Sequence, residues 1–146
     1  MLFRPYPGSG HATSWYPGVV SRRAATVVHV DGGDALTGID APLASVGSLT
    51  GTVRTPNGIG VGSARLSLYA PTDRYAPSYS TSTSLNGGFT LAALLPGAYK
   101  VRIQTWDAAG TAVEWWQDAA TRESATEVVV PAGGMATIAP VVAPGA

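Results

Sequence analysis

A two-residue alternation of apolar and polar side chains constrains the fold of this chain most strongly, and the stretch from Tyr99 to Trp106 shows it best. The odd-numbered positions of this stretch are Tyr, Val, Ile and Thr, whereas the even-numbered positions are Lys, Arg, Gln and Trp. Successive side chains of a β-strand point to opposite faces, so this pattern is typical of a strand with one face in a core. No window of the chain has a sustained helical period.

Shorter alternating segments follow at intervals of roughly ten residues, separated by turn residues such as Asn57-Gly58 and Pro96-Gly97. The 18 glycines and 11 prolines of the chain supply these interruptions. Short strands at this spacing are typical of two packed sheets. We therefore expect an all-β, antiparallel, Ig-like or prealbumin-like β-sandwich. The expected strands are 48–53, 64–69, 80–84 (a polar edge strand), 89–91, 99–106, 113–117, 125–130 and 136–142, with loops at 70–79 and 107–110.

The chain also contains an internal repeat. When the sequence is shifted against itself by 100 positions, ten identities occur between positions 10 and 43. Two of them, Trp15 with Trp115 and Arg22 with Arg122, are not explained by a bias toward small residues. The other eight are Gly10/Gly110, Ala12/Ala112, Ala25/Ala125, Thr26/Thr126, Val28/Val128, Val30/Val130, Gly33/Gly133 and Thr37/Thr137. Self-similarity at a fixed interval is the signature of repeated structural units.

The repeat predicts how the chain is divided. We expect residues 1–44 to be the C-terminal half of a preceding repeat and residues 45–146 to be one complete β-sandwich repeat. Strands within residues 1–44 would then have open edges and an uncovered apolar face. We therefore expect residues 1–44 to pack against the complete repeat or to pair with a second copy of the chain.

A family resemblance rests on the segment from Phe89 to Val101, which has the pattern Phe-x-Leu-x-x-Leu-x-Pro-Gly-x-Tyr-x-Val. This pattern resembles that of the carboxypeptidase regulatory-like domain, a transthyretin- or prealbumin-like β-sandwich. Gly51–Val53 and Ala64–Tyr69 look like the family's front strands, and Glu114–Trp116 with residues 125–130 looks like its tandem form in secreted bacterial proteins. The resemblance covers nearly all of residues 45–146. It implies an accessory module, and an extracellular or cell-surface location.

Composition excludes several classes of function. The formal net charge is 0 and only 12% of residues are charged, which excludes a nucleic-acid binder that works by neutralising phosphates. Without cysteine the chain has neither disulfides nor thiolate metal sites. No apolar run has the length of a membrane span, and Met1–Pro7 lacks the pattern of a signal peptide. We therefore expect no nucleic-acid partner and no membrane insertion.

Catalytic and metal-binding chemistry find little support in the sequence. Both histidines, His11 and His29, lie outside the complete repeat, so no Ser–His–acid arrangement can be argued there. The single lysine, Lys100, lies on the outward face of its strand, and the last strand has no Asn or Asp that could form an isopeptide bond with it. The aspartate pairs at 31/34 and 107/118 do not match a calcium loop. We expect no enzyme activity, no catalytic residues, no cofactor and no metal.

Aromatic side chains are the best candidates for a binding site. Trp115 and Trp116 are adjacent on an expected strand, so they must point to opposite faces, and one of them is exposed or half-covered. Exposed planar rings on a flat β-face stack against sugars or anchor a protein partner. The alternative is that these rings cover the sandwich edge or the junction between consecutive repeats. The candidate ligand-binding residues are Trp106, Trp115, Trp116, Arg102 and Gln104.

The preferred function is that of a non-catalytic extracellular β-sandwich module, a spacer, adhesion or protein-interaction element of a repeat protein. Its partners would be neighbouring repeats, or a second copy that associates through residues 1–44. One alternative is a carbohydrate-binding module that binds polysaccharide through its surface tryptophans. The other is an accessory domain of a secreted hydrolase.

Overall fold

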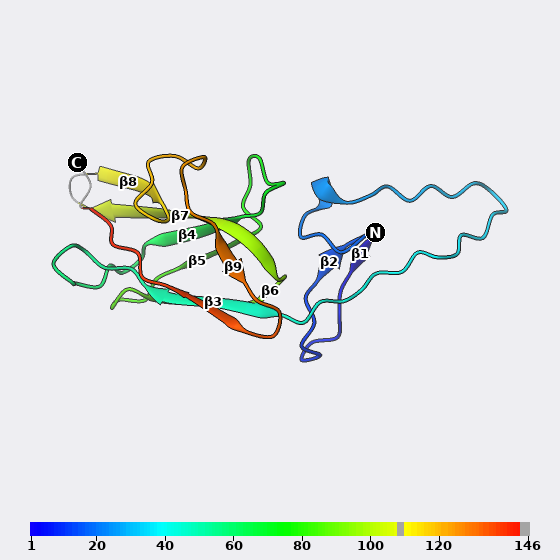
Figure 1. The fold of residues 1–146 in the computed structure, drawn as a ribbon, viewed down its shortest axis with the longest axis horizontal. Helices are drawn as coiled ribbons and strands as arrows, with labels where there is room; N and C mark the ends of the chain where they lie inside the picture. The colour runs from blue at the N-terminus through cyan, green and yellow to red at the C-terminus, as the bar shows by residue number, and fades with distance from the viewer. Residues whose placement is uncertain (108–109, 144–146) are drawn as a thin grey trace.

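The computed structural model describes residues 1–107 and 110–143 and has two parts (Figure 1). Residues 1–44 lie beyond one end of a β-sandwich and contain β1 (Leu2–Phe3), β2 (Ser14–Trp15) and the 3-10 helix η1 (Arg22–Ala24). No helix in the described part of the chain is long and apolar enough to span a bilayer.

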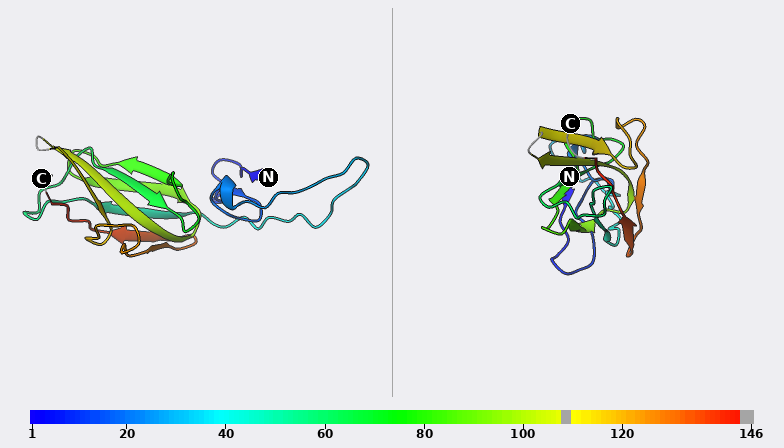
Figure 2. Two further views of the ribbon diagram at one scale, coloured as in Figure 1. Left: turned by 90° about the horizontal axis from the view of Figure 1, so that it is seen from above. Right: turned by 90° about the vertical axis from the view of Figure 1, so that its left-hand side faces the viewer.

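Two β-sheets form the sandwich, seen from above and from one end in Figure 2. One sheet has the order β10-β3-β6, with β10 (Met135–Ile138), β3 (Gly47–Thr52) and β6 (Gly88–Leu94). The other has the order β5-β4-β7-β8, with β5 (Tyr79–Ser82), β4 (Arg65–Tyr69), β7 (Gly97–Asp107) and β8 (Gly110–Trp115). The short strand β9 (Val128–Val130) pairs with the beginning of β7.

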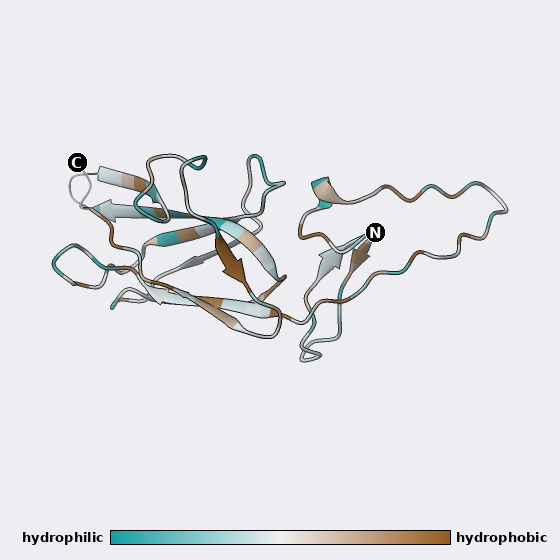
Figure 3. Cartoon of the chain, viewed as in Figure 1, coloured by the Kyte–Doolittle hydropathy of each residue, from teal (hydrophilic) through white to brown (hydrophobic). Residues whose placement is uncertain are grey.

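The core lies between the sheets and follows the predicted alternation. Leu66 and Leu68 of β4 are fully buried, and Val101 of β7 lies opposite Leu68 in the same layer. The hydropathy colouring shows β9 as the most uniformly apolar strand (Figure 3). The buried apolar cluster comprises Leu49, Val53, Ala64, Leu66, Leu68, Ala70, Phe89, Leu94, Tyr99, Val101, Ile103, Val128, Val130, Ile138 and Val142.

The predicted fold class is confirmed, because the chain is all-β and forms a sandwich of largely antiparallel sheets. The polar segment around 80–84 is an edge strand as expected, since β5 is the outer strand of its sheet. One pairing differs from the antiparallel expectation: β10 runs parallel to β3. The chain changes sheets between β9 and β10, and this crossover delivers β10 alongside β3 in the same direction.

Several strand ends also differ from the prediction. β7 continues to Asp107 and β8 begins at Gly110, so both ends of the predicted loop at 107–110 belong to paired strands, and residues 108–109 lie outside the described residues. β9 is shorter than the predicted strand 125–130, because the preceding residues form a hydrogen-bonded loop in which the amide of Thr126 donates to the carbonyl of Trp116 (2.7 Å).

Residues 1–44 contact the near end of the sandwich. The amide of Val46 donates to the carbonyl of Gly10 (2.8 Å), and Ser45 forms an antiparallel β-bridge with His11. The guanidinium carbon of Arg23 lies 5.4 Å from the centre of the Tyr75 ring. Between η1 and β3, by contrast, the chain makes a long excursion away from the sandwich and returns to it (Figure 1). We refer to residues 27–43 as the excursion.

Candidate functional site

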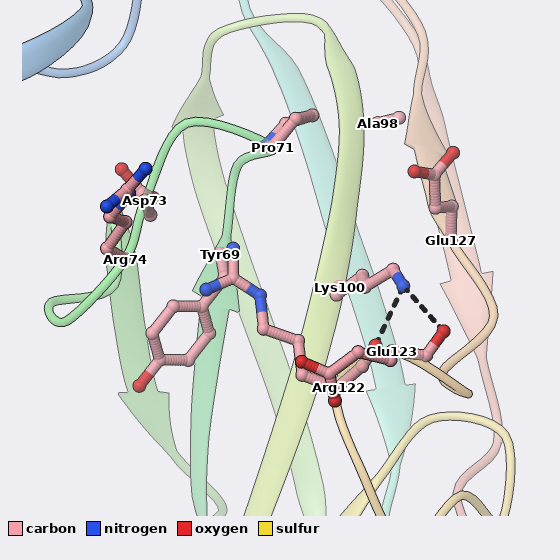
Figure 4. A pocket seen from close by; sticks show the side chains of 9 residues that line it. All are labelled: Tyr69, Pro71, Asp73, Arg74, Ala98, Lys100, Arg122, Glu123 and Glu127. Carbon is pink, nitrogen blue, oxygen red and sulfur yellow. Dashed lines mark hydrogen bonds between the residues drawn. The ribbon is translucent and has the colours of Figure 1, made fainter.

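A cavity of about 490 Å³ lies on the outer side of the sheet that contains β4 and β7 (Figure 4). Its walls come from these two strands, from the loop after β4 and from the segment that leads into β9. Most of its polar side chains carry a charge. The lining residues are Tyr69, Pro71, Asp73, Arg74, Ala98, Lys100, Arg122, Glu123 and Glu127.

Lys100 lies in the middle of this cavity, and its ammonium group binds the backbone of the chain itself. Nζ donates to the carbonyl of Arg122 (2.7 Å) and to that of Glu123 (3.2 Å), as the dashed lines in Figure 4 show. The predicted outward orientation of Lys100 therefore places it where it holds the loop before β9 against β7. Hydrogen bonds from a charged donor are among the stronger ones in proteins.

Arg122 fixes the same loop from the other side. Its Nη2 donates to the carbonyl of Ala70 (2.9 Å), and its guanidinium carbon lies 4.9 Å from the centre of the Tyr69 ring. Tyr69 in turn lies 5.2 Å from Trp115, centre to centre, with the ring planes tilted by 52°. Arg122, Tyr69 and Trp115 therefore form one continuous contact across the outer face of the sheet, which we call the outer stack.

Asp73 forms its hydrogen bonds within the loop after β4. It is buried, and its Oδ2 accepts hydrogen bonds from the amide of Ala70 (2.9 Å) and from Oγ of Ser78 (2.5 Å), which shapes the loop after β4. Within the described residues, no group of three His, Cys, Asp or Glu side chains could hold a metal ion. Lys100, Arg122 and Asp73 thus hold two loops in place.

Four of the five predicted ligand-binding residues share one face. Arg102, Gln104 and Trp106 alternate along β7 with its buried positions, and Trp115 of β8 lies opposite Arg102. Nη1 of Arg102 donates to Oε1 of Gln104 (3.0 Å). Trp106 is 53% exposed, whereas Trp115 is partly covered in the outer stack. The two tryptophans lie four strand positions apart, about 13 Å along the sheet.

The fifth predicted residue, Trp116, is not part of this face. It packs against the buried core, and its amide donates to the carbonyl of Val101 (2.9 Å). The prediction left open which of the adjacent tryptophans would face outward, and the structure places Trp115 on the outer face. Sequence reasoning missed the contacts of Lys100 and Arg122. For the contacts of Arg122, the one signal in the sequence was the recurrence of an arginine at positions 22 and 122.

The backbone around Trp115 and Arg122 occurs a second time, 100 residues earlier. In β7 and β8, Arg102 pairs with Trp115 and Ile103 with Glu114. In β1 and β2, Leu2 pairs with Trp15 and Phe3 with Ser14, which is the same register. The short strands of residues 1–44 therefore correspond to the middle of the β7–β8 hairpin.

The hydrogen bonds of the following loops correspond as well. Trp15 pairs with Val19 as Trp115 pairs with Ala119. The side-chain oxygen of Ser21 accepts from the amide of Ala24, as that of Thr121 accepts from Ser124. The matching backbone donor–acceptor pairs are Tyr16–Met1 and Trp116–Val101, Ala25–Arg22 and Ala125–Arg122, and Thr26–Tyr16 and Thr126–Trp116.

Comparisons with known proteins add little to this description. No family model matches the chain, and no curated protein matches it. Among solved structures, the chain is similar to a DUF3823 family protein from Parabacteroides merdae ATCC 43184, with 18% sequence identity and a TM-score of 0.41. The match covers 66% of this chain and 45% of that protein, so the chain spans less than half of its length.

Proposed function

We propose that this chain is a non-catalytic β-sandwich module that acts as a spacer and protein-interaction element of an extracellular repeat protein. The observation that carries the proposal is the recurrence of one register and one set of loop hydrogen bonds 100 residues apart. Units that recur in this way are the building blocks of linear arrays, in which each unit contacts only its neighbours.

The path of the chain supports a linear array. The chain enters the sandwich at β3, next to residues 1–44, and leaves after β10 toward the opposite end (Figure 1). Modules connected in this way follow one another in a line. The joint before β3 contains Ala41-Pro42-Leu43-Ala44, in which the proline restricts the backbone and limits how far the neighbours can swing.

The chemistry of the cavity supports a non-catalytic role. Lys100, Arg122 and Asp73 each bind backbone groups of the loops around the cavity. Groups used in this way stabilise the module. The resemblance of Phe89–Val101 to the carboxypeptidase regulatory-like domain favours an accessory module and an extracellular or cell-surface location.

A distance measurement between the two parts tests the spacer function. The chain has no cysteine, so two engineered cysteines can be spin-labelled without interference. We expect Tyr6→Cys with Asn57→Cys to give a distance distribution as narrow as that of the control pair Asn57→Cys and Ala132→Cys within the sandwich. A distribution several times broader than the control would contradict a spacer that fixes the placement of its neighbour.

A second candidate function, polysaccharide binding, is favoured by the exposed ring of Trp106 beside Arg102 and Gln104. Co-sedimentation with starch, cellulose, chitin and bacterial cell wall tests it. Binding that Trp106→Ala abolishes, and that the control Tyr6→Ala leaves intact, would establish the carbohydrate function; Tyr6 is an exposed aromatic residue of the other part of the chain. The spacer function predicts that the parent chain and both variants stay in the supernatant with every polysaccharide.

A further inference from the structure

A second cavity, of about 300 Å³, lies where residues 1–44 meet the sandwich. Trp15 and residues 20–23 form one wall, and residues 73–78 of the loop after β4 form the other. Its two walls thus belong to the two parts of the chain, and we call it the junction cavity.

Three arginines of the junction cavity, Arg22, Arg23 and Arg74, have no anionic partner. Within the part of the chain that the structure describes, none of them forms an ion pair or a hydrogen bond through its side chain. Arg122, the counterpart of Arg22 in the complete repeat, differs in this respect, because it donates to the carbonyl of Ala70. A guanidinium group always carries its charge and offers five N–H donors. The junction cavity therefore presents unused donors of positive charge.

The carboxylates around the loop after β4 leave these charges uncompensated. Among the described lining residues of the junction cavity, Asp73 is the one acidic residue, and its buried Oδ2 already binds an amide and a hydroxyl of its own loop. Glu123 and Glu127 line the larger cavity and lie well apart from Arg74 (Figure 4). The junction cavity thus has an excess of positive charge, although the formal net charge of the chain is 0.

Apolar side chains form the inner part of the junction cavity. Trp15, Val20 and Pro77 are half-buried, whereas the three arginines are exposed. The exposed ring of Tyr75 lies beside the guanidinium group of Arg23. Protein interfaces have an apolar centre and a polar rim, and Trp, Tyr and Arg are the residues most enriched among those that dominate binding energy. The residue types of the junction cavity are therefore those of a protein-binding site.

We propose that the junction cavity binds an acidic segment of a protein partner, in which carboxylates flank one apolar side chain. The apolar side chain enters beside Trp15 and Val20, and the carboxylates accept hydrogen bonds from Arg22 and Arg74, since the guanidinium group matches the geometry of a carboxylate. The bound segment contacts residues 1–44 and the sandwich at once. The inference rests on the proposed function, because it specifies the chemistry of the partner of a protein-interaction element.

Peptide binding to the full chain tests the inference. The probe is the fluorescently labelled peptide Glu-Glu-Phe-Glu-Glu, blocked at both ends, and fluorescence anisotropy measures its Kd. Arg22→Gln and Arg74→Gln should each raise the Kd at least about tenfold, because each variant removes a charged hydrogen-bond donor. The controls Arg4→Gln and Arg65→Gln remove the same charge from exposed positions outside the cavity, so each should change the Kd less than about twofold.

Two further probes test the chemistry of the ligand. The peptide Gln-Gln-Phe-Gln-Gln should not bind, because it has no negative charge. Trigalacturonate, an acidic sugar, should bind more weakly than the acidic peptide, because it lacks the apolar side chain. The inference would be overturned if the acidic peptide did not bind, if the uncharged peptide bound as well, or if the control variants had the same effect as the cavity variants. Tighter binding of trigalacturonate would overturn it too, in favour of an acidic polysaccharide.

The spin-label distances decide the spacer function separately. A narrow distance distribution without peptide binding would leave the spacer function in place and remove this inference alone. A broad distribution with peptide binding that depends on Arg22 and Arg74 would remove the spacer function and leave the binding site.

Discussion

At the scale of single residues, Tyr99 shows how the core accommodates a polar group. Burial raises the pKa of its hydroxyl well above the usual range, so the group stays protonated and acts as a donor. It donates to the carbonyl of Leu95 (2.5 Å), while the amide of Leu95 donates to the hydroxyl of Tyr79 (3.1 Å). The two tyrosine rings meet edge to face at 5.8 Å. Both backbone groups of Leu95 are thereby satisfied beside the Pro96-Gly97 turn.

Tyr99→Phe should lower the free energy of unfolding by about 1–3 kcal/mol, because the buried carbonyl of Leu95 loses its donor. Urea unfolding followed by tryptophan fluorescence measures the change. Tyr75→Phe is the matched control, since Tyr75 is 79% exposed and keeps its ring beside Arg23. Equal stabilities of the two variants would show that the hydroxyl of Tyr99 contributes nothing.

Glu114 gives the fold a pH dependence. Burial raises the pKa of its carboxyl above the usual range of a glutamate, the negative charge of Asp118 raises it further, and a hydrogen bond with the backbone of Ala143 opposes both. The folded state therefore binds this proton more tightly than the unfolded state. The contribution of Glu114 to stability is fully present below about pH 4.5 and is lost as the pH rises through the folded-state pKa.

Glu114→Gln should therefore raise the thermal midpoint at pH 7 and have little effect at pH 3.5. Scanning calorimetry at the two pH values measures this difference. The exposed Glu127→Gln serves as the control and should change neither midpoint. A Glu114→Gln variant that is less stable than the parent chain at pH 7 would show that the carboxylate is stabilised in the fold.

At the scale of elements, the sequence predicts the features that depend only on which side chains are buried. The faces of β3, β4 and β7 were predictable, since a side chain's position in a two-residue period determines which face it occupies. The shared face of Arg102, Gln104 and Trp106 followed from the same period. The parallel pairing of β10 was not predictable, because the crossover between the sheets determines which strand lies beside β10. The contacts of Lys100 and Arg122 were also missed, since separate loops bring their partners together.

The parallel pair of β10 and β3 depends on Gly51. A Cβ at this position would lie 2.0 Å from the carbonyl oxygen of Ile138 and 2.9 Å from the Phe89 ring, so β10 would have to move away from β3. Gly51→Ala should destabilise the sandwich by about 1–3 kcal/mol, measured by urea unfolding. Gly32→Ala is the control, because nothing lies within 4 Å of its Cβ position. A Gly51→Ala variant as stable as Gly32→Ala would contradict the close packing of the two strands.

At the scale of the whole molecule, stability is concentrated in the sandwich. Every residue of the buried apolar cluster lies between Leu49 and Val142, and Val20 is the one residue of 1–44 that packs against it. Residues 1–44 contribute two-residue strands and a few hydrogen bonds at the near end of the sandwich. The sandwich should therefore fold without help from the excursion, which is held only at its two ends.

Limited proteolysis tests this division. Thermolysin cleaves beside apolar residues in extended, accessible backbone, and in the excursion Val27 is 89% exposed and Leu36 48% exposed. We expect the first cuts within residues 27–43, and a resistant product that begins near β3. Its thermal midpoint should lie within about 3 °C of that of the uncut chain, because the buried cluster remains whole. If cleavage within β3 to β10 were equally fast, or the midpoint fell much further after the first cut, then residues 1–44 would be an integral part of the sandwich and not its neighbour.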